Sequence, residues 1–124
     1  MDLTVWIVSA ALAVLFALSG TAKLTMSRER LIATGQTGIA VYPMPLVRFA
    51  AACEILGAVG IVGPWALGVA PGLTPAAAVG LALVMVGAAA AHTRLREPWP
   101  VVANAVILAA CLFVAVTRIG MLGS

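Results

Sequence analysis

Charge is scarce in this sequence. Lysine, arginine, aspartate and glutamate make up only 9% of the 124 residues, whereas 64% are hydrophobic. In soluble domains about a quarter of the residues are charged, so the composition excludes a water-soluble domain and indicates an integral membrane protein. The small net charge of +3 fits basic residues beside anionic lipid headgroups and gives no indication of nucleic-acid binding.

Residues with metal-binding or redox chemistry are equally few. The chain has one histidine and two cysteines, Cys53 and Cys111, which lie far apart in sequence. A metal or haem centre needs several strong ligands, and a dithiol centre needs a close pair such as Cys-x-x-Cys. The sequence offers neither pattern, and it has no phosphate-binding glycine loop or hydrolase serine motif. We therefore predict no metal site.

Four long apolar stretches dominate what is present. Each has close to the ~20 residues with which a helix crosses about 30 Å of hydrocarbon. They cover residues 3–24, 46–69, 74–93 and 101–117. The sequence therefore predicts an all-α membrane protein, a four-transmembrane-helix bundle, with residues 1–124 as a single domain. Residues 28–40 form either a short interfacial helix or a plain connecting loop.

Basic residues are concentrated in two of the connections. Arg28 and Arg30 follow the first stretch, and Arg94 and Arg96 follow the third. The positive-inside rule then places both connections in the cytoplasm and both termini outside, with Arg118 as the residue that opposes this orientation.

Glu54 is the most informative single residue, because it lies within an apolar stretch. A carboxylate at mid-span costs about 2.5–3.5 kcal/mol on insertion scales, so such residues normally face the bundle interior and have a partner. We expect Lys23 or His92 from a neighbouring helix as that partner. Arg48 lies about 120° around the same helix from Glu54, so it would reach Glu54 only through water.

Each of the four stretches contributes one polar group to the half of the bundle next to the basic connections: Lys23, Glu54, His92 and Asn104. Helical spacing therefore predicts one inward-facing pocket at their common end. Its residues either hold the helices together or bind a ligand, and both readings are open. In the second reading Glu54 and His92 are the catalytic acid–base pair. The ligand-binding candidates are Lys23, Arg48, Met85, Asn104 and Cys111.

Several strings, in this order and spacing, are similar to the DoxX-like family of small four-helix bacterial membrane proteins related to DoxD and DoxX. They are Phe16-Ala-Leu-Ser-Gly-Thr-Ala-Lys23-Leu24, Glu54-Ile-Leu-Gly57-Ala-Val-Gly60, Leu73-Thr-Pro75 and His92-Thr-Arg94, followed by Asn104. The resemblance implies a multi-pass protein of the bacterial cytoplasmic (inner) membrane. It also implies that Lys23, Glu54, His92 and Asn104 occupy the family's recurring polar positions.

Some relatives of that family resemble the membrane subunit of thiosulfate:quinone oxidoreductase, so the resemblance implies a redox-linked role with a quinone or another hydrophobic small molecule. The absence of a cysteine pair argues against thiosulfate oxidation. Two alternatives stay open: a cofactor-free isomerase acting on a lipophilic substrate, and a non-enzymatic accessory or assembly protein. Small-residue faces are compatible with a homodimer or a membrane protein partner. A small multidrug exporter fits less well, because the first stretch lacks a carboxylate at its centre.

Overall fold

The computed structural model describes residues 2–122, and these are almost entirely helical. In chain order the elements are α1 (Asp2–Thr25), α2 (Arg28–Ala33), the 3-10 helix η1 (Thr37–Val41), α3 (Met44–Leu67), α4 (Leu73–Arg94) and α5 (Pro98–Leu122). The first three long helices agree with the expected ranges to within two residues. The fourth, α5, extends beyond its expected range at both ends. Its early start at Pro98 is physically reasonable, because proline is tolerated in the first turn of a helix.

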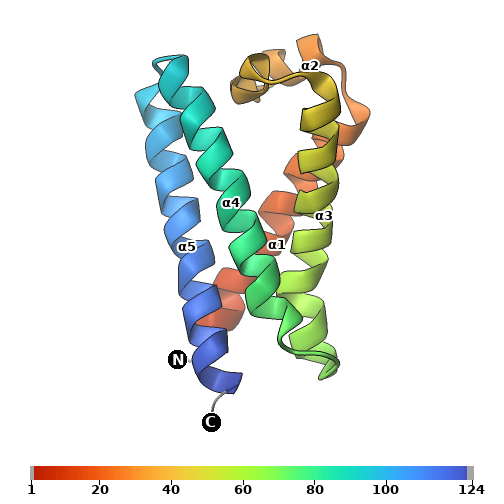
Figure 1. The fold of residues 1–124 in the computed structure, drawn as a ribbon, viewed down its shortest axis with the longest axis vertical. Helices are drawn as coiled ribbons and strands as arrows, with labels where there is room; N and C mark the ends of the chain where they lie inside the picture. The colour runs from red at the N-terminus through yellow and green to blue at the C-terminus, as the bar shows by residue number, and fades with distance from the viewer. Residues whose placement is uncertain (1, 123–124) are drawn as a thin grey trace.

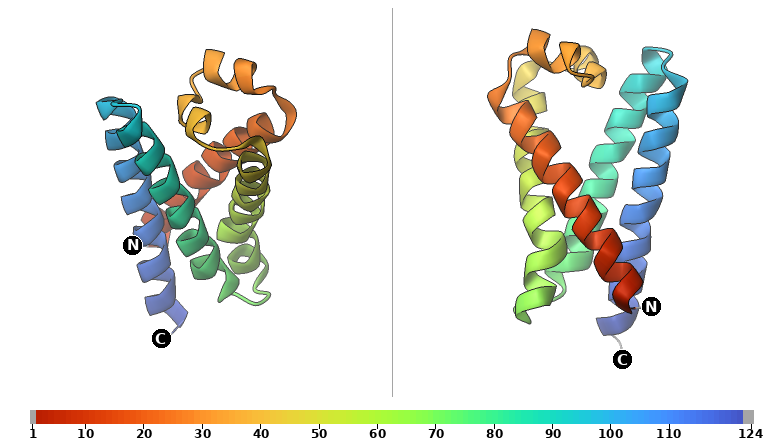
Figure 2. Two further views of the ribbon diagram at one scale, coloured as in Figure 1. Left: turned by 45° about the horizontal axis from the view of Figure 1, so that its top comes forward. Right: turned by 180° about the vertical axis from the view of Figure 1, so that it is seen from behind.

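The long helices form one bundle with two distinct ends (Figure 1). The α3–α4 connection and both ends of the described chain lie at one end, while α2, η1 and the α4–α5 turn lie at the other. Helix α1 crosses the bundle diagonally, from α5 at the first end to α3 at the second (Figure 2). The two connections that carry the basic residues are therefore at the same end.

The outer surface of the bundle is apolar. Leu56, Leu83 and Val116 are about 70% exposed (71%, 68% and 70%), which would be unfavourable for such large hydrophobic side chains in water. All four long helices are long and apolar enough to cross a membrane. The chain is therefore a multi-pass integral membrane protein whose exposed side chains contact the lipid bilayer.

The interior is filled by a continuous apolar core between the four long helices. Phe16 of α1, Ile61 of α3 and Leu81 of α4 are among its fully buried members. Met85 and Cys111, both predicted as ligand-binding residues, belong to this core as well. Their side chains are thus in apolar packing contacts.

The α2–η1 segment folds across one end of the bundle. Arg28 at the start of α2 donates hydrogen bonds to the carbonyl oxygens of Ile39 (3.3 Å), Ala40 (3.4 Å) and Tyr42 (2.6 Å), which holds α2 and η1 together. The Tyr42 hydroxyl in turn donates to the Gly87 carbonyl oxygen of α4 at 2.7 Å. We call residues 28–42 the cap, because these bonds fasten the segment over the ends of α3 and α4. Residues 28–40, expected to form a short helix or a loop, thus contain α2 and most of η1.

Candidate functional site

A buried ion pair joins α1 to α3. The Lys23 ammonium nitrogen Nζ lies 2.8 Å from Glu54 Oε2. The Glu54 side chain is fully buried and that of Lys23 is 11% exposed. The sequence predicted either Lys23 or His92 as the direct partner of Glu54, and Lys23 is the one found. The second carboxylate oxygen, Glu54 Oε1, has no hydrogen-bond partner within residues 2–122.

Close contact between the two helices makes this pair possible. Gly20 lies one turn before Lys23, and a Cβ atom placed on it would be 2.8 Å from the Ala51 carbonyl oxygen and 3.3 Å from Glu54 Cβ. The absence of a side chain at Gly20 therefore allows α1 to approach α3 closely. Arg48 reinforces the same junction, since its Nη1 donates to the Lys23 carbonyl oxygen at 2.6 Å and so satisfies an acceptor in the last turn of α1.

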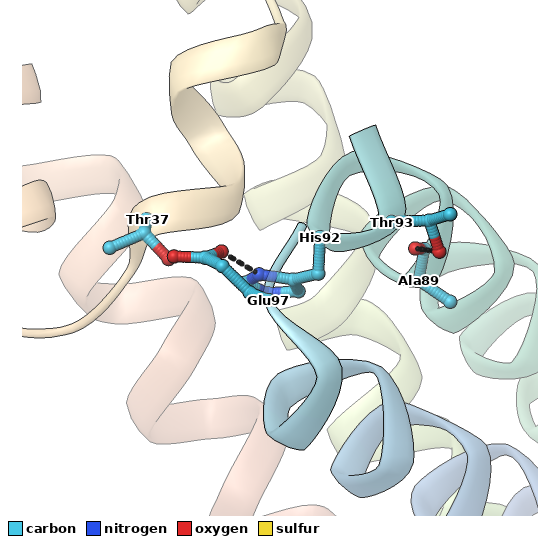
Figure 3. Close-up of polar contacts among 5 residues, drawn as sticks. All are labelled: Thr37, Ala89, His92, Thr93 and Glu97. Carbon is cyan, nitrogen blue, oxygen red and sulfur yellow. Dashed lines mark hydrogen bonds and ion pairs between the residues drawn. The ribbon is translucent and has the colours of Figure 1, made fainter. Parts of the chain in front are cut away.

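His92 has a different partner from the one considered in the sequence. Its Nδ1 lies 2.7 Å from Glu97 Oε1, and the Thr37 hydroxyl of η1 donates to the same oxygen at 2.9 Å (Figure 3). Because an ionised carboxylate only accepts hydrogen bonds, His92 Nδ1 carries the proton in this contact. The second ring nitrogen, Nε2, takes no part in it. Glu97 therefore connects the end of α4 to the cap.

Glu97 lies in the α4–α5 turn, outside the long helices. The hydrogen bond from His92 and, after it, that from Thr37 lower the pKa of its carboxyl group below the ordinary 4.5, and partial desolvation opposes them. Hydrogen bonds to a carboxylate favour the charged form, which explains the direction of the shift. Glu97 is therefore an ionised acceptor at neutral pH.

A cavity of about 270 Å³ lies between α3 and α4 beneath the cap. Lys23 and His92, two of the sequence-predicted site residues, both contribute to its wall. Most of the remaining wall is apolar. The full lining consists of Lys23, Gln36, Gly38, Ile39, Tyr42, Leu46, Val47, Ala50, Val84, Gly87, Ala88 and His92.

The other sequence-predicted site residues lie outside this wall. Glu54 contacts the Lys23 ammonium, and Arg48 binds the Lys23 carbonyl oxygen. Asn104 is buried on α5, and its Nδ2 has no hydrogen-bond partner in the described part of the chain. Together with the core positions of Met85 and Cys111, this means that the predicted residues do not line one common pocket. The reason is that α1 crosses diagonally to meet α3, whereas α5 packs on the far side of α4.

Sequence reasoning missed Glu97 and Thr37 altogether. The available signal for Glu97 was its position between His92 and the prolines that begin α5, since a carboxylate in so short a turn can reach back to the preceding helix. It also treated Arg118 as a charge at the opposite end of the bundle. The Arg118 side chain is fully buried and lies over the rings of Trp6 and Trp65, at 4.6 and 4.4 Å from their centres.

Fold and site together define a small helical membrane protein with a buried ion pair beside a capped apolar cavity. The chain belongs to the DoxX-like family, because the model of that family matches residues 7–114. This confirms the resemblance seen in the sequence. No curated protein and no solved structure matches the chain. No group of three or more histidine, cysteine, aspartate or glutamate residues within the described range is arranged to hold a metal ion.

Proposed function

We propose that this protein binds a small lipophilic molecule in the cavity between α3 and α4, and that this molecule is a quinone used in a redox-linked role. One observation carries the proposal: a lysine held by a buried glutamate forms part of the wall of an otherwise apolar cavity. Binding sites for small molecules typically combine apolar walls with a few fixed polar groups. The cavity has this composition.

The division of roles follows from the contacts. Lys23 Nζ would donate to a ligand oxygen, while Glu54 holds Lys23 in place through the 2.8 Å contact. In this proposal Glu54 contacts Lys23 and not the ligand. Its expected acid–base role would therefore act on the ligand only by way of the Lys23 ammonium. The apolar side chains of Ile39, Val47 and Val84 would contact the ring.

His92 and Glu97 support the redox-linked part. Reduction of a quinone to its quinol takes up two electrons and two protons. Residues 2–122 contain no cluster of metal ligands, and their two cysteines, Cys53 and Cys111, are free. A partner oxidoreductase would deliver the electrons. His92 would pass protons between the cavity and the bundle end at which Glu97 is partly exposed, because an imidazole can accept a proton at one ring nitrogen and release one from the other.

The orientation is part of the same proposal. The capped end carries the two basic connections, so the positive-inside rule favours a cytoplasmic cap and termini on the outside. Within the bacterial inner membrane, the cavity would then exchange protons with the cytoplasm. A fluorescent-protein fusion at the carboxyl terminus that fluoresces only when cytoplasmic would stay dark if this orientation is correct.

Two alanines on α3 offer a matched test. Ala50 lines the cavity, whereas Ala52, two residues further on, is exposed on the outer surface. In lipid nanodiscs, wild type and Ala52→Phe should bind decylubiquinone equally, and Ala50→Phe should bind about tenfold less because the added ring occupies the cavity. Equal binding by all three proteins would refute the cavity as the quinone site.

A further inference from the structure

The hydrogen-bonding capacity of Lys23 is only partly used. An ammonium group has three N–H donors, and one of them binds Glu54 Oε2. No other hydrogen bond to Nζ is found in residues 2–122, although Lys23 is nine-tenths buried (9% exposed) and forms part of the cavity wall. Unused donors beside an apolar space favour a ligand with a hydrogen-bond acceptor.

The charges around the cavity decide which kind of acceptor fits. Glu54 offsets the charge of Lys23 at 2.8 Å, and the Glu97 carboxylate lies behind His92 at 2.7 Å. A ligand carboxylate would therefore add a negative charge close to the two carboxylates that lie directly behind the wall residues Lys23 and His92. In surroundings of low dielectric constant, that addition is unfavourable, whereas a carbonyl oxygen accepts from an ammonium without bringing a charge.

We infer that Lys23 determines the specificity of the cavity, which selects uncharged lipophilic molecules with a carbonyl oxygen and rejects fatty-acid anions. This inference rests on the proposed function, because it concerns the same cavity. It goes further, since it makes the hydrogen bond from Lys23 the basis of ligand selection and names the ligand class that the cavity excludes. Quinones are one member of the selected class.

Three probes of equal chain length separate these properties: methyl nonyl ketone, undecane and undecanoate. Each would be equilibrated with wild-type protein in lipid nanodiscs, and its partitioning into nanodiscs that hold Ala50→Phe would be subtracted as the lipid background. We expect the ketone to bind wild type about tenfold more tightly than undecane, as one charge-assisted hydrogen bond implies, and more tightly than undecanoate. The infrared carbonyl stretch of the bound ketone should shift to lower frequency.

A double variant identifies the donor. Single removal of Lys23 leaves Glu54 buried without a partner, so we choose Lys23→Met/Glu54→Leu, which replaces the pair by apolar side chains of similar size. This variant should bind ketone and undecane alike and leave the carbonyl stretch unshifted. The comparison of ligands on wild type needs no variant, so the test stands even if this one does not fold.

The outcomes separate the two proposals. Equal binding of ketone and undecane by wild type, or tighter binding of undecanoate, would overturn the specificity assigned to Lys23 and leave lipophile binding intact. If the carbonyl stretch of the bound ketone is shifted as far in the double variant as in wild type, Lys23 is not the donor. If none of the three probes exceeds the Ala50→Phe background, both the specificity and the proposed function fail.

Discussion

Lys23 and Glu54 form an ion pair with a separation of 2.8 Å between Nζ and Oε2, inside a membrane protein in which 9% of residues are charged. The pair joins the last turn of α1 to the middle of α3 at the point where Gly20 allows the two helices to approach closely. Because Lys23 also lines the cavity, one contact links the packing of the bundle to the candidate binding site.

Each partner of this pair should be costly to remove alone. Lys23→Met leaves a buried carboxylate and Glu54→Leu leaves a buried ammonium, and breaking a buried pair typically costs about 3–5 kcal/mol. The double variant should recover most of that loss, because neither charge is then unpaired. A double-mutant cycle of unfolding free energies in mixed micelles measures this. Additive losses in the double variant would show that the two residues do not interact.

Gly20 gives a prediction about helix packing. A methyl group at this position would be 2.8 Å from the Ala51 carbonyl oxygen and from Ile55 Cγ1. Since backbone cannot easily move aside, Gly20→Ala should lower the unfolding free energy by about 1–3 kcal/mol. Gly80→Ala on α4 is the control, because nothing lies within 4 Å of its added methyl. Thermal unfolding that gives equal midpoints for both variants would contradict the close approach.

Glu97 gives a prediction about pH. The His92 and Thr37 hydrogen bonds lower the pKa of its carboxyl group in the folded state, so its contribution to holding the cap is fully present above the ordinary 4.5 and is lost as pH falls through the lowered folded value. The NMR signal of the Glu97 side-chain carboxyl carbon (Cδ) should titrate with a midpoint below pH 4.5 in wild type. The titration midpoint should move back up in His92→Leu, because this variant removes the hydrogen bond that is the largest cause of the shift. A midpoint that is the same in both proteins would contradict the assigned cause.

Arg118 gives a prediction for the opposite end of the bundle. Its guanidinium lies over Trp6 of α1 and Trp65 of α3, so it joins three helices. Two such contacts contribute about 1–2 kcal/mol, and lysine cannot reproduce the planar stacking. Arg118→Lys and Arg118→Met should therefore both lower the unfolding free energy. Arg94→Met, at an exposed position, should leave it within about 0.5 kcal/mol; a loss as large as that of Arg118→Met would indicate a general effect of basic residues.

The sequence was sufficient to predict the long helices, because a run of about 20 apolar residues is typical of a membrane-spanning helix. It also predicted that Glu54 is buried and that its direct partner is either Lys23 or His92, of which Lys23 is the one found. It could not predict the diagonal course of α1, since that depends on the close approach at Gly20 rather than on any periodicity. Asn104 and Cys111 lie away from the cavity because α5, which carries both, packs mainly on the far side of α4.

The cap illustrates a second limit. Thr37, His92 and Glu97 meet because a turn between α4 and α5 brings a carboxylate under η1. The three residues lie up to sixty positions apart, and no short-range pattern connects them. A hydrogen-bonded contact of this kind follows from tertiary arrangement alone, so it is found only in the structure.

The central claim is that the cavity holds a lipophilic ligand, and native mass spectrometry of protein extracted gently from its own membrane tests it most directly. Wild type and Ala52→Phe should carry a bound lipophilic molecule, and Ala50→Phe should lack it because the added ring occupies the cavity. An equal absence of bound molecules in all three proteins, or the same molecule retained by Ala50→Phe, would contradict the account.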